Sequence, residues 1–149
     1  MPVKKEDIKR FLMDTKISEV MASPVITVKG SDNFAVVNEK MSIYDLRHLP
    51  VVDEKGSIMG IITQRDLYQI HSPTRLEDGS WFYDNEVLNQ FLLMKVMTPD
   101  PFTLKPSNSI YEAIEATVRF KFGCIPIVDD NKHPCGILTR HTVLKFLIT

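Results

Sequence analysis

The sequence predicts an α+β protein in which two β-α-β-β-α repeats pack sheet to sheet with pseudo-twofold symmetry. Two observations lead to this prediction. When the sequence is shifted by 76 positions, 12 of the 47 residues from 20 to 66 are identical, with no gap. Each copy also carries the same order of hydrophobic patterns, and a unit of roughly 50 residues cannot cover both faces of its own sheet.

Each copy opens on a short strand pattern and continues into a helical one. We expect strands at 25–28 and 102–104, where β-branched and other apolar residues cluster. Apolar residues then recur at helical spacing over 34–41 and over 110–118. Ser107 is the predicted N-cap of the second of these helices.

A hairpin and a second helix complete each copy. The predicted strands are 49–52 and 58–62 in copy one and 125–128 and 135–138 in copy two. Polar turns join them, at 53–56 in copy one and at 129–134 in copy two. The closing helices are expected to begin after Thr63 and after Thr139, so both copies have the same order of elements.

The repeats define the domain organisation. We expect an N-terminal helical segment at 1–16, a first repeat at 17–70, a linker with a helix at 71–92 and a second repeat at 93–149. The apolar residues expected to face inward from the flanking helices are Ile8, Phe11 and Leu12 in the first segment and Val87, Leu88, Phe91 and Leu92 in the linker. The linker aromatics Trp81, Phe82 and Tyr83 either cover the core or form an interface patch.

Composition and charge exclude several classes of protein. The 18 Lys and Arg against 19 Asp and Glu give a net charge of −1, without the cationic surplus of a nucleic-acid-binding protein. Two cysteines are too few for a disulfide framework or a four-cysteine zinc site. Because Val128 is predicted to pair with Cys135, Cys124 lies roughly 13 Å from Cys135 along the hairpin. This distance is too long for a shared metal or a disulfide. We therefore expect no metal and no cofactor. We also expect no membrane span and a cytoplasmic location, since no leader or long apolar run occurs.

Two motif-bearing units of this kind resemble a known family. Each carries V-M, then h-P-h-V-D, then G-I-h-T. The last two motifs lie within LRHLPVVDEKGSIMGIITQRDL in copy one and FGCIPIVDDNKHPCGILTRHTVL in copy two. Together they resemble a tandem pair of cystathionine β-synthase (CBS) domains, or Bateman module, over 17–70 and 93–148. The resemblance implies a stand-alone regulatory module that senses an adenosine-containing ligand in clefts between the domains. It also implies a homodimer that acts on an unidentified effector protein and performs no chemistry.

The T-x-x-D motif at 63–66 is the first candidate for ligand binding. Thr63 ends a predicted strand, and Asp66 falls in the first turn of the next helix. The threonine hydroxyl and the free amides of that turn can donate to phosphate or ribose oxygens, and the Asp66 carboxylate can accept from both hydroxyls of a cis-diol. The resemblance assigns Asp66 this ribose role. The same spacing is also a helix-capping box, which is compatible with ligand binding.

A basic pair precedes the second strand of copy one. Arg47 and His48 can form a solvated strand entrance, but similar kinase-regulating CBS proteins use a basic pair here to contact the nucleotide phosphate. Arg47 can clamp a phosphate with paired donors, and His48 adds charge only when protonated. The resemblance further implies base contacts from the opposite copy. These residues are Asp100, Pro101 and Phe102, with Leu138 and Thr139 nearby.

Copy two departs from the motif. Thr142 stands where copy one has Asp66, and Gly123-Cys124 replaces Arg47-His48. We therefore expect a second, degenerate site that binds weakly, binds something else or stays empty. Its candidate residues are Ser23, Val25, Ile26, Cys124, Arg140, His141 and Thr142.

Three alternatives remain beside a sensor of AMP, ADP or ATP. An S-adenosylmethionine sensor is disfavoured by the two added cations at 47–48. A ligand-independent dimerisation or docking module is favoured by the linker aromatics if they are exposed. An enzyme is not expected, because no nucleophile, glycine-rich phosphate loop or metal pair accompanies His48 and Asp66.

Overall fold

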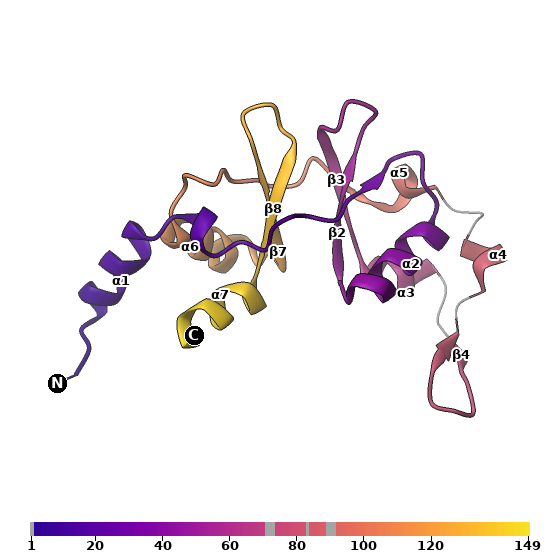
Figure 1. Cartoon of the computed structure of the whole chain (residues 1–149), viewed down its shortest axis with the longest axis horizontal. Helices are drawn as coiled ribbons and strands as arrows, with labels where there is room; N and C mark the ends of the chain where they lie inside the picture. The colour runs from indigo at the N-terminus through magenta and orange to yellow at the C-terminus, as the bar shows by residue number, and fades with distance from the viewer. Residues whose placement is uncertain (1, 71–73, 83, 89–91) are drawn as a thin grey trace. The chain divides into compact units, whose positions relative to one another are not determined.

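The computed structural model describes residues 2–70, 74–82, 84–88 and 92–149. Its elements, labelled in Figure 1, are α1 (Lys5–Asp14), η1 (Ile17–Glu19), β1 (Val28–Lys29), α2 (Phe34–Tyr44), β2 (His48–Val52), β3 (Ile58–Thr63), α3 (Gln64–Ile70), β4 (Thr74–Arg75), β5 (Trp81–Phe82), α4 (Asn85–Leu88), α5 (Leu93–Val96), β6 (Thr98–Pro99), α6 (Ile110–Phe120), β7 (Cys124–Val128), β8 (Pro134–Thr139) and α7 (Arg140–Ile148). They form two compact units. Unit 1 comprises Met1–Val25 and Phe102–Thr149, and unit 2 comprises Ile26–Pro101.

Unit 2 is built on a four-stranded sheet of order β1-β2-β3-β6. The predicted hairpin is confirmed: β2 and β3 pair antiparallel, with His48 opposite Thr63 and Pro50 opposite Ile61. The first predicted strand is shorter than expected, because only Val28 and Lys29 join the ladder, beside β2. The carbonyl of Thr27 instead accepts a 2.7 Å hydrogen bond from the side chain of Lys40.

Unit 1 repeats this arrangement with less regular edges. Strands β7 and β8 form the predicted hairpin, flanked by a parallel bridge between Leu104 and Ile127 and an antiparallel bridge between Ala22 and Ile137. The expected strand at 102–104 is therefore reduced to a single bridge. The expected pairing of Val128 with Cys135 is wrong by one residue, because a bulge after Ile127 places Val128 opposite Pro134.

The outer strand of each sheet comes from the first residues of the other repeat. Thr98 and Pro99, which follow the V-M motif of copy two, pair with β3 of copy one. Ala22, ahead of the first strand of copy one, bonds in both directions with Ile137 of copy two, at 2.9 and 3.1 Å. Under the 76-residue shift these two pairings are equivalent, so the duplicated sequence makes the same contact twice.

Methionines of the V-M motifs pack on glycines of this outer edge. A Cβ built on Gly60 meets the side chain of Met97, and a Cβ built on Gly136 meets that of Met21, in both cases far inside van der Waals contact. The backbone oxygens of Thr98 and Ala22 also lie within about 3 Å of these positions. Glycine is therefore required in G-I-h-T because the strand from the other repeat approaches so closely.

The predicted N-cap of α6 is wrong by two residues, whereas the N-cap of α2 was not predicted. Asn33 caps α2 by accepting from the Val36 amide at 3.3 Å. Ser109, not the predicted Ser107, caps α6 by accepting from the Glu112 amide at 3.1 Å. Ser109 has extended backbone angles directly before Ile110, which is the geometry an N-cap needs.

The core of each unit lies between its sheet and its helices. In unit 2 the predicted helix residues Phe34, Val37 and Met41 are buried, together with Leu67 of α3 and Leu88 of α4. In unit 1 the buried cluster is Ile17, Val20, Ile110, Ala113, Ala116, Ile125, Ile127 and Leu138. Burial of each large apolar side chain contributes about 1.5–3 kcal/mol.

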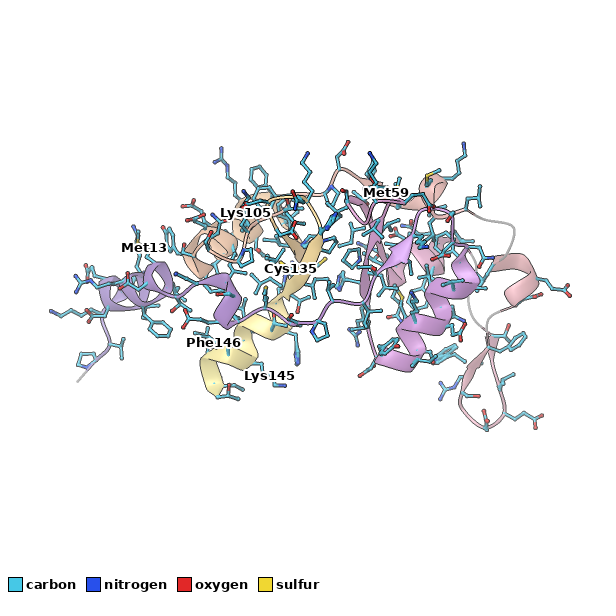
Figure 2. The ribbon with its side chains drawn as sticks, turned by 45° about the horizontal axis from the view of Figure 1, so that its top comes forward. Met13, Met59, Lys105, Cys135, Lys145 and Phe146 are labelled. Atoms are coloured by element: carbon cyan, nitrogen blue, oxygen red, sulfur yellow. The ribbon has the colours of Figure 1, made fainter. Side chains whose placement is uncertain are left out.

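The N-terminal helix packs less deeply than predicted. Ile8 is 48% exposed and Phe11 52% exposed, so neither is a core residue, while the partly buried Leu12 packs against the core of unit 1. Phe11 stacks on Phe146 of α7, with ring centroids 6.4 Å apart; Figure 2 labels Phe146. Within unit 1 this helix is therefore held by the partly buried Leu12 and by the contact of Phe11 with Phe146, and not by deep burial of Ile8 and Phe11.

Two of the linker aromatics, Trp81 and Phe82, do not cover the core. Trp81 is 61% exposed and Phe82 52% exposed in the β4–β5 hairpin, where Arg75 lies 5.6 Å from the Trp81 ring. In the predicted linker helix Leu88 is buried, but Leu92 is exposed. The remaining predictions for this segment, on Tyr83, Phe91 and the Val87 side chain, lie outside the described residues.

We expect Gly136→Ala to destabilise the protein by about 1–3 kcal/mol, because the added methyl overpacks against Met21. Urea unfolding of the full chain measures the change. The double variant Gly136→Ala with Met21→Ala should recover part of the loss, since the smaller residue vacates the space. Additive losses in the double variant would show that the contact with Met21 is not the cause.

Candidate functional site

Four of the predicted residues converge at one end of the β2–β3 hairpin in unit 2. His48 is the cross-strand partner of Thr63, and the carbonyl of Arg47 accepts from the Gln64 amide at 2.9 Å. Asp66 follows in the first turn of α3. The hairpin register therefore brings the basic pair and the T-x-x-D motif together.

Asp66 and Thr63 form a reciprocal cap. Asp66 Oδ2 accepts from the Thr63 amide at 2.8 Å and from the Thr63 hydroxyl at 3.1 Å, while Thr63 Oγ1 accepts from the Asp66 amide at 3.3 Å. All of these carboxylate bonds use Oδ2. Among the described residues Oδ1 takes no hydrogen bond, and the Asp66 side chain is only half-buried. The cap thus leaves one carboxylate oxygen available to a hydroxyl donor.

Copy two keeps the cap but loses the carboxylate. The Thr142 hydroxyl accepts from the Thr139 amide at 2.8 Å and donates to the Thr139 carbonyl at 2.8 Å, while the Thr142 amide donates to Thr139 Oγ1 at 3.2 Å. Threonine therefore replaces Asp66 as a capping residue and offers no second oxygen. Comparing Asp66 with Thr142 therefore separates helix capping, which both residues perform, from ligand binding, for which only Asp66 has a free carboxylate oxygen.

Charge at this end of unit 2 is set by Arg47, His48 and Asp66. Burial is the largest influence on His48 and lowers its pKa; the Arg47 charge lowers it further, and the Asp66 charge opposes both. His48 is therefore held neutral in the folded chain near pH 7. Its contribution to stability is present above its unfolded pKa and is lost as pH falls through the lowered folded value.

The predicted base-contacting residues of unit 2 lie further along β3. The Asp100 amide donates to the Met59 carbonyl at 3.2 Å, four residues before Thr63, which is roughly 13 Å along a strand. Asp100 has a positive φ of 46°, so the chain turns here before Pro101. A ligand that touched both Asp66 and Asp100 would have to extend along this strand.

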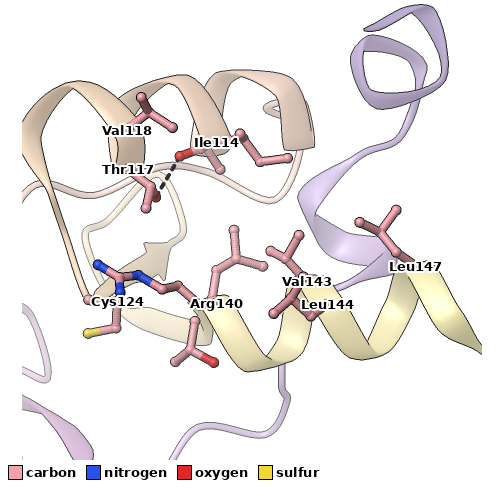
Figure 3. A pocket seen from close by; sticks show the side chains of 12 residues that line it. Ile114, Thr117, Val118, Cys124, Arg140, Val143, Leu144 and Leu147 are labelled. Atoms are coloured by element: carbon pink, nitrogen blue, oxygen red, sulfur yellow. Dashed lines mark hydrogen bonds between the residues drawn. The ribbon is translucent and has the colours of Figure 1, made fainter. Parts of the chain in front are cut away.

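The other predicted residues belong to unit 1, except Ile26. Phe102 packs against Phe122 with centroids 5.2 Å apart and stays 39% exposed. Cys124 lies opposite Thr139 in the β7–β8 hairpin, and Leu138 is buried beneath them. Cys124, Leu138, Thr139 and Arg140 are among the residues that line a mostly apolar pocket (Figure 3). The Ser23 hydroxyl donates to the Cys135 carbonyl at 3.2 Å, at the other end of β8.

The cysteines are isolated from each other and from metal-ligand partners. Cys124 and Cys135 are both free thiols, and burial raises the pKa of Cys124 to about 12. Over the described ranges no three His, Cys, Asp or Glu side chains gather as a metal site would require. In the same ranges no helix is long and apolar enough to cross a bilayer.

Comparison with known proteins identifies the family. The CBS domain family matches residues 17–71 and 93–149, and this chain belongs to it. Inosine-5'-monophosphate dehydrogenase of Methanocaldococcus jannaschii is 32% identical over 130 residues, which cover 87% of this chain and 23% of that protein. Homoserine O-acetyltransferase of Methanocorpusculum labreanum is 26% identical, with 90% of this chain and 24% of that protein covered. The chain thus spans about a quarter of these two relatives.

Solved structures share the fold over most of the chain. The CBS domain of a CBS domain-containing membrane protein from Sphaerobacter thermophilus is 27% identical with a TM-score of 0.80, covering 95% of this chain and 93% of that one. CBSX2 in complex with AMP is 22% identical with a TM-score of 0.72, covering 90% and 96%. The CBS domain pair of protein MJ0100 with 5'-methylthioadenosine and S-adenosyl-L-methionine is 20% identical with a TM-score of 0.72, covering 89% and 95%.

We expect Asp66→Thr to unfold at nearly the same urea concentration as the wild type, because Thr142 shows that threonine can make this cap. Asp66→Ala should lose about 1 kcal/mol, because the Thr63 amide loses its acceptor. Equal losses in both variants would mean that the carboxylate has a structural role that threonine cannot take over.

Proposed function

We propose that the chain is a regulatory module that binds AMP, ADP or ATP at the Asp66 end of unit 2 and transmits the bound state to an effector protein. The observation that carries this proposal is the convergence of Arg47 and His48 with the Thr63–Asp66 cap, which leaves Asp66 Oδ1 available. The solved complexes of relatives with AMP and with S-adenosyl-L-methionine support the adenosine class.

Each residue has a distinct role in this proposal. Asp66 Oδ1 accepts from a ribose hydroxyl while Oδ2 maintains the cap. Arg47 clamps the phosphate through its planar, multiply donating guanidinium. His48 gains a proton when a phosphate dianion approaches, since the added negative charge offsets its desolvation. Base contacts are assigned to Asp100–Phe102, Leu138 and Thr139, as the resemblance implies.

The wider setting is part of the same proposal. The repeats at 17–70 and 93–149 form the module, with 1–16 and 71–92 as flanking segment and linker, and the protein acts as a cytoplasmic homodimer. Ligand binding changes the balance between two states of the module, and the effector distinguishes those states. No catalytic step is assigned to any residue.

One observation favours a second candidate function. The exposed Trp81 and Phe82 are residue types common in protein interfaces, and neither belongs to the described core of unit 2. A docking module that needs no ligand would use this surface. An S-adenosylmethionine sensor has less support, because a sulfonium gains nothing from Arg47 and His48.

Calorimetric titration with AMP, ADP, ATP and S-adenosylmethionine tests the proposal. We expect one nucleotide to bind saturably near one per chain and roughly 10- to 100-fold more weakly to Asp66→Thr, which loses a charge-assisted hydrogen bond. Because that variant keeps the cap, weaker binding reports the ligand role alone. Glu39→Gln, which removes an exposed acid from α2, serves as the matched control. Unchanged affinity in Asp66→Thr, or no binding of any of the four, would overturn the assignment in favour of docking.

Nucleotide affinity should rise as pH falls below the ordinary histidine range, because the phosphate favours the imidazolium form of His48 while burial and Arg47 hold the free side chain neutral. The phosphate itself gains a proton near pH 6, which weakens binding in any variant. The measurement is therefore the ratio of wild-type to His48→Gln affinity between pH 5 and 8. A ratio that stays constant across this range would exclude His48 from the site.

A further inference from the structure

The β4–β5 hairpin of unit 2, labelled β4 in Figure 1, has all of its side chains on the surface. Every residue from 74 to 82 is exposed, and three of these residues are large and apolar: Leu76, Trp81 and Phe82. A two-stranded hairpin usually gains its stability by packing one face against a core. None of these three side chains belongs to the described core of unit 2. The hairpin therefore leaves apolar surface without a described partner.

The turn of the hairpin is held by its own hydrogen bonds. Asp78 Oδ1 accepts from the Ser80 amide at 2.9 Å and from the Ser80 hydroxyl at 2.5 Å. The Leu76 amide donates to the Ser80 carbonyl at 2.8 Å, and the Gly79 amide donates to the Leu76 carbonyl at 3.0 Å. The aromatic side chains are therefore presented on a preformed scaffold, which lowers the cost of binding a partner.

Both faces and both edges of the hairpin are available. Trp81 and Phe82 are consecutive in β5, so their side chains lie on opposite faces. Among the residues that the structure describes, neither β4 nor β5 pairs with a third strand. An open edge can accept an added strand, whose alternate side chains then reach both faces. An extended segment can thus contact both aromatic rings, whereas a helix packed on one face can contact only one.

Negative charge is concentrated in the hairpin and in the helix that follows it. From 74 to 88 the sequence has one cation, Arg75, and four acids, which are Glu77, Asp78, Asp84 and Glu86. The rest of the chain has 17 Lys and Arg against 15 Asp and Glu, so the excess of acid is local. Hydrogen bonds from the hydroxyl and amide of Ser80 lower the pKa of Asp78, which keeps this carboxylate charged. Such a surface attracts a cationic partner and repels nucleic acids and anionic membranes.

The repeat indicates that this hairpin is not needed for the fold. Under the 76-residue shift, positions 78–82 correspond to 2–6, where α1 begins at Lys5 and no strand forms. Unit 1 therefore forms its core without a counterpart of the hairpin. A surface that the fold does not require, with exposed aromatic rings and a local excess of acid, is typical of a binding surface.

We propose that the β4–β5 hairpin binds an extended segment of the effector protein that is rich in basic and apolar residues. The segment adds to an open edge of the hairpin, its apolar side chains pack on the rings of Trp81 and Phe82, and its cations pair with Glu77 and Asp78. This inference rests on the effector docking proposed above and specifies the chemistry of the segment that docks. It does not depend on the residues of the nucleotide site.

Fluorescence titration of the full chain tests the proposal, because Trp81 is the only tryptophan of the sequence. The capped peptide Lys-Val-Val-Lys-Val-Val-Lys should produce a saturable blue shift of the Trp81 emission, since the bound peptide covers the indole ring. The same peptide with glutamate in place of lysine should bind roughly 10-fold more weakly or less. A lysine peptide with N-methylated valines should also bind roughly 10-fold more weakly, because it keeps the charge but cannot complete a strand ladder.

Two charge variants separate the hairpin from the rest of unit 2. The turn variant, Glu77→Gln with Asp78→Asn, keeps the oxygen that Ser80 bonds and should weaken the lysine peptide by roughly 10- to 100-fold. The control variant, Glu39→Gln with Glu54→Gln, removes the same charge from exposed positions of α2 and of the β2–β3 turn. Its affinity for the peptide should equal that of the wild type. Both variants should bind nucleotide as the wild type does, so this test is separate from that of the nucleotide site.

Three results would overturn the proposal. The first is lysine-peptide binding that is absent, or that is equal in the wild type and the turn variant. The second is a Trp81 emission shift with phosphatidylglycerol vesicles but not with the peptide, which would assign the hairpin to a membrane surface. The third is sedimentation showing a dimer that Trp81→Ala dissociates while the peptide fails to bind the wild type, which would assign the hairpin to a second copy of the chain.

Discussion

The close approach of a methionine-bearing strand to a glycine is the constraint on which both units depend. Met97 over Gly60 and Met21 over Gly136 set how near the outer strand can lie to the hairpin. The hairpin in turn positions Thr63 and Thr139, from which α3 and α7 begin. A side chain at either glycine would displace the strand and, through it, the end of the hairpin that carries the candidate sites.

Most of the fold could be predicted because its signals are local. The hairpins follow from paired apolar runs that flank polar turns beginning with Asp, and the helices follow from the spacing of their apolar residues. The origin of the outer strands could not be predicted, because identical V-M motifs give no indication of which glycine each will contact. Small shifts also escaped prediction: the bulge after Ile127 moves one pairing, and the chain enters α6 two residues later than Ser107. Both depend on backbone geometry that composition does not encode.

The candidate sites show the same division. Register alone predicts that His48 faces Thr63, so the polar site of unit 2 is visible in the sequence. The apolar pocket of unit 1 was not predicted, because the two copies were compared for groups that copy two lacks, such as the acid replaced by Thr142. They were not compared for the apolar side chains that copy two gains. A position-by-position comparison of the copies contained the signal: Met41 against Thr117, and Asn38 against Ile114. What remained hidden was whether the smaller residues leave a void or the helices close over it.

The discontinuity of unit 1 limits how this protein can be divided. Unit 2 is one continuous stretch, whereas unit 1 joins Met1–Val25 to Phe102–Thr149. A cut between the repeats would therefore leave the C-terminal fragment without Ile17, which is fully buried in its core, and without the bridge at Ala22. Such a fragment keeps the surface of Phe102–Thr149 against which Met1–Val25 packs. The molecule is thus suited to fragment complementation, in which the two halves regain structure only when they are mixed.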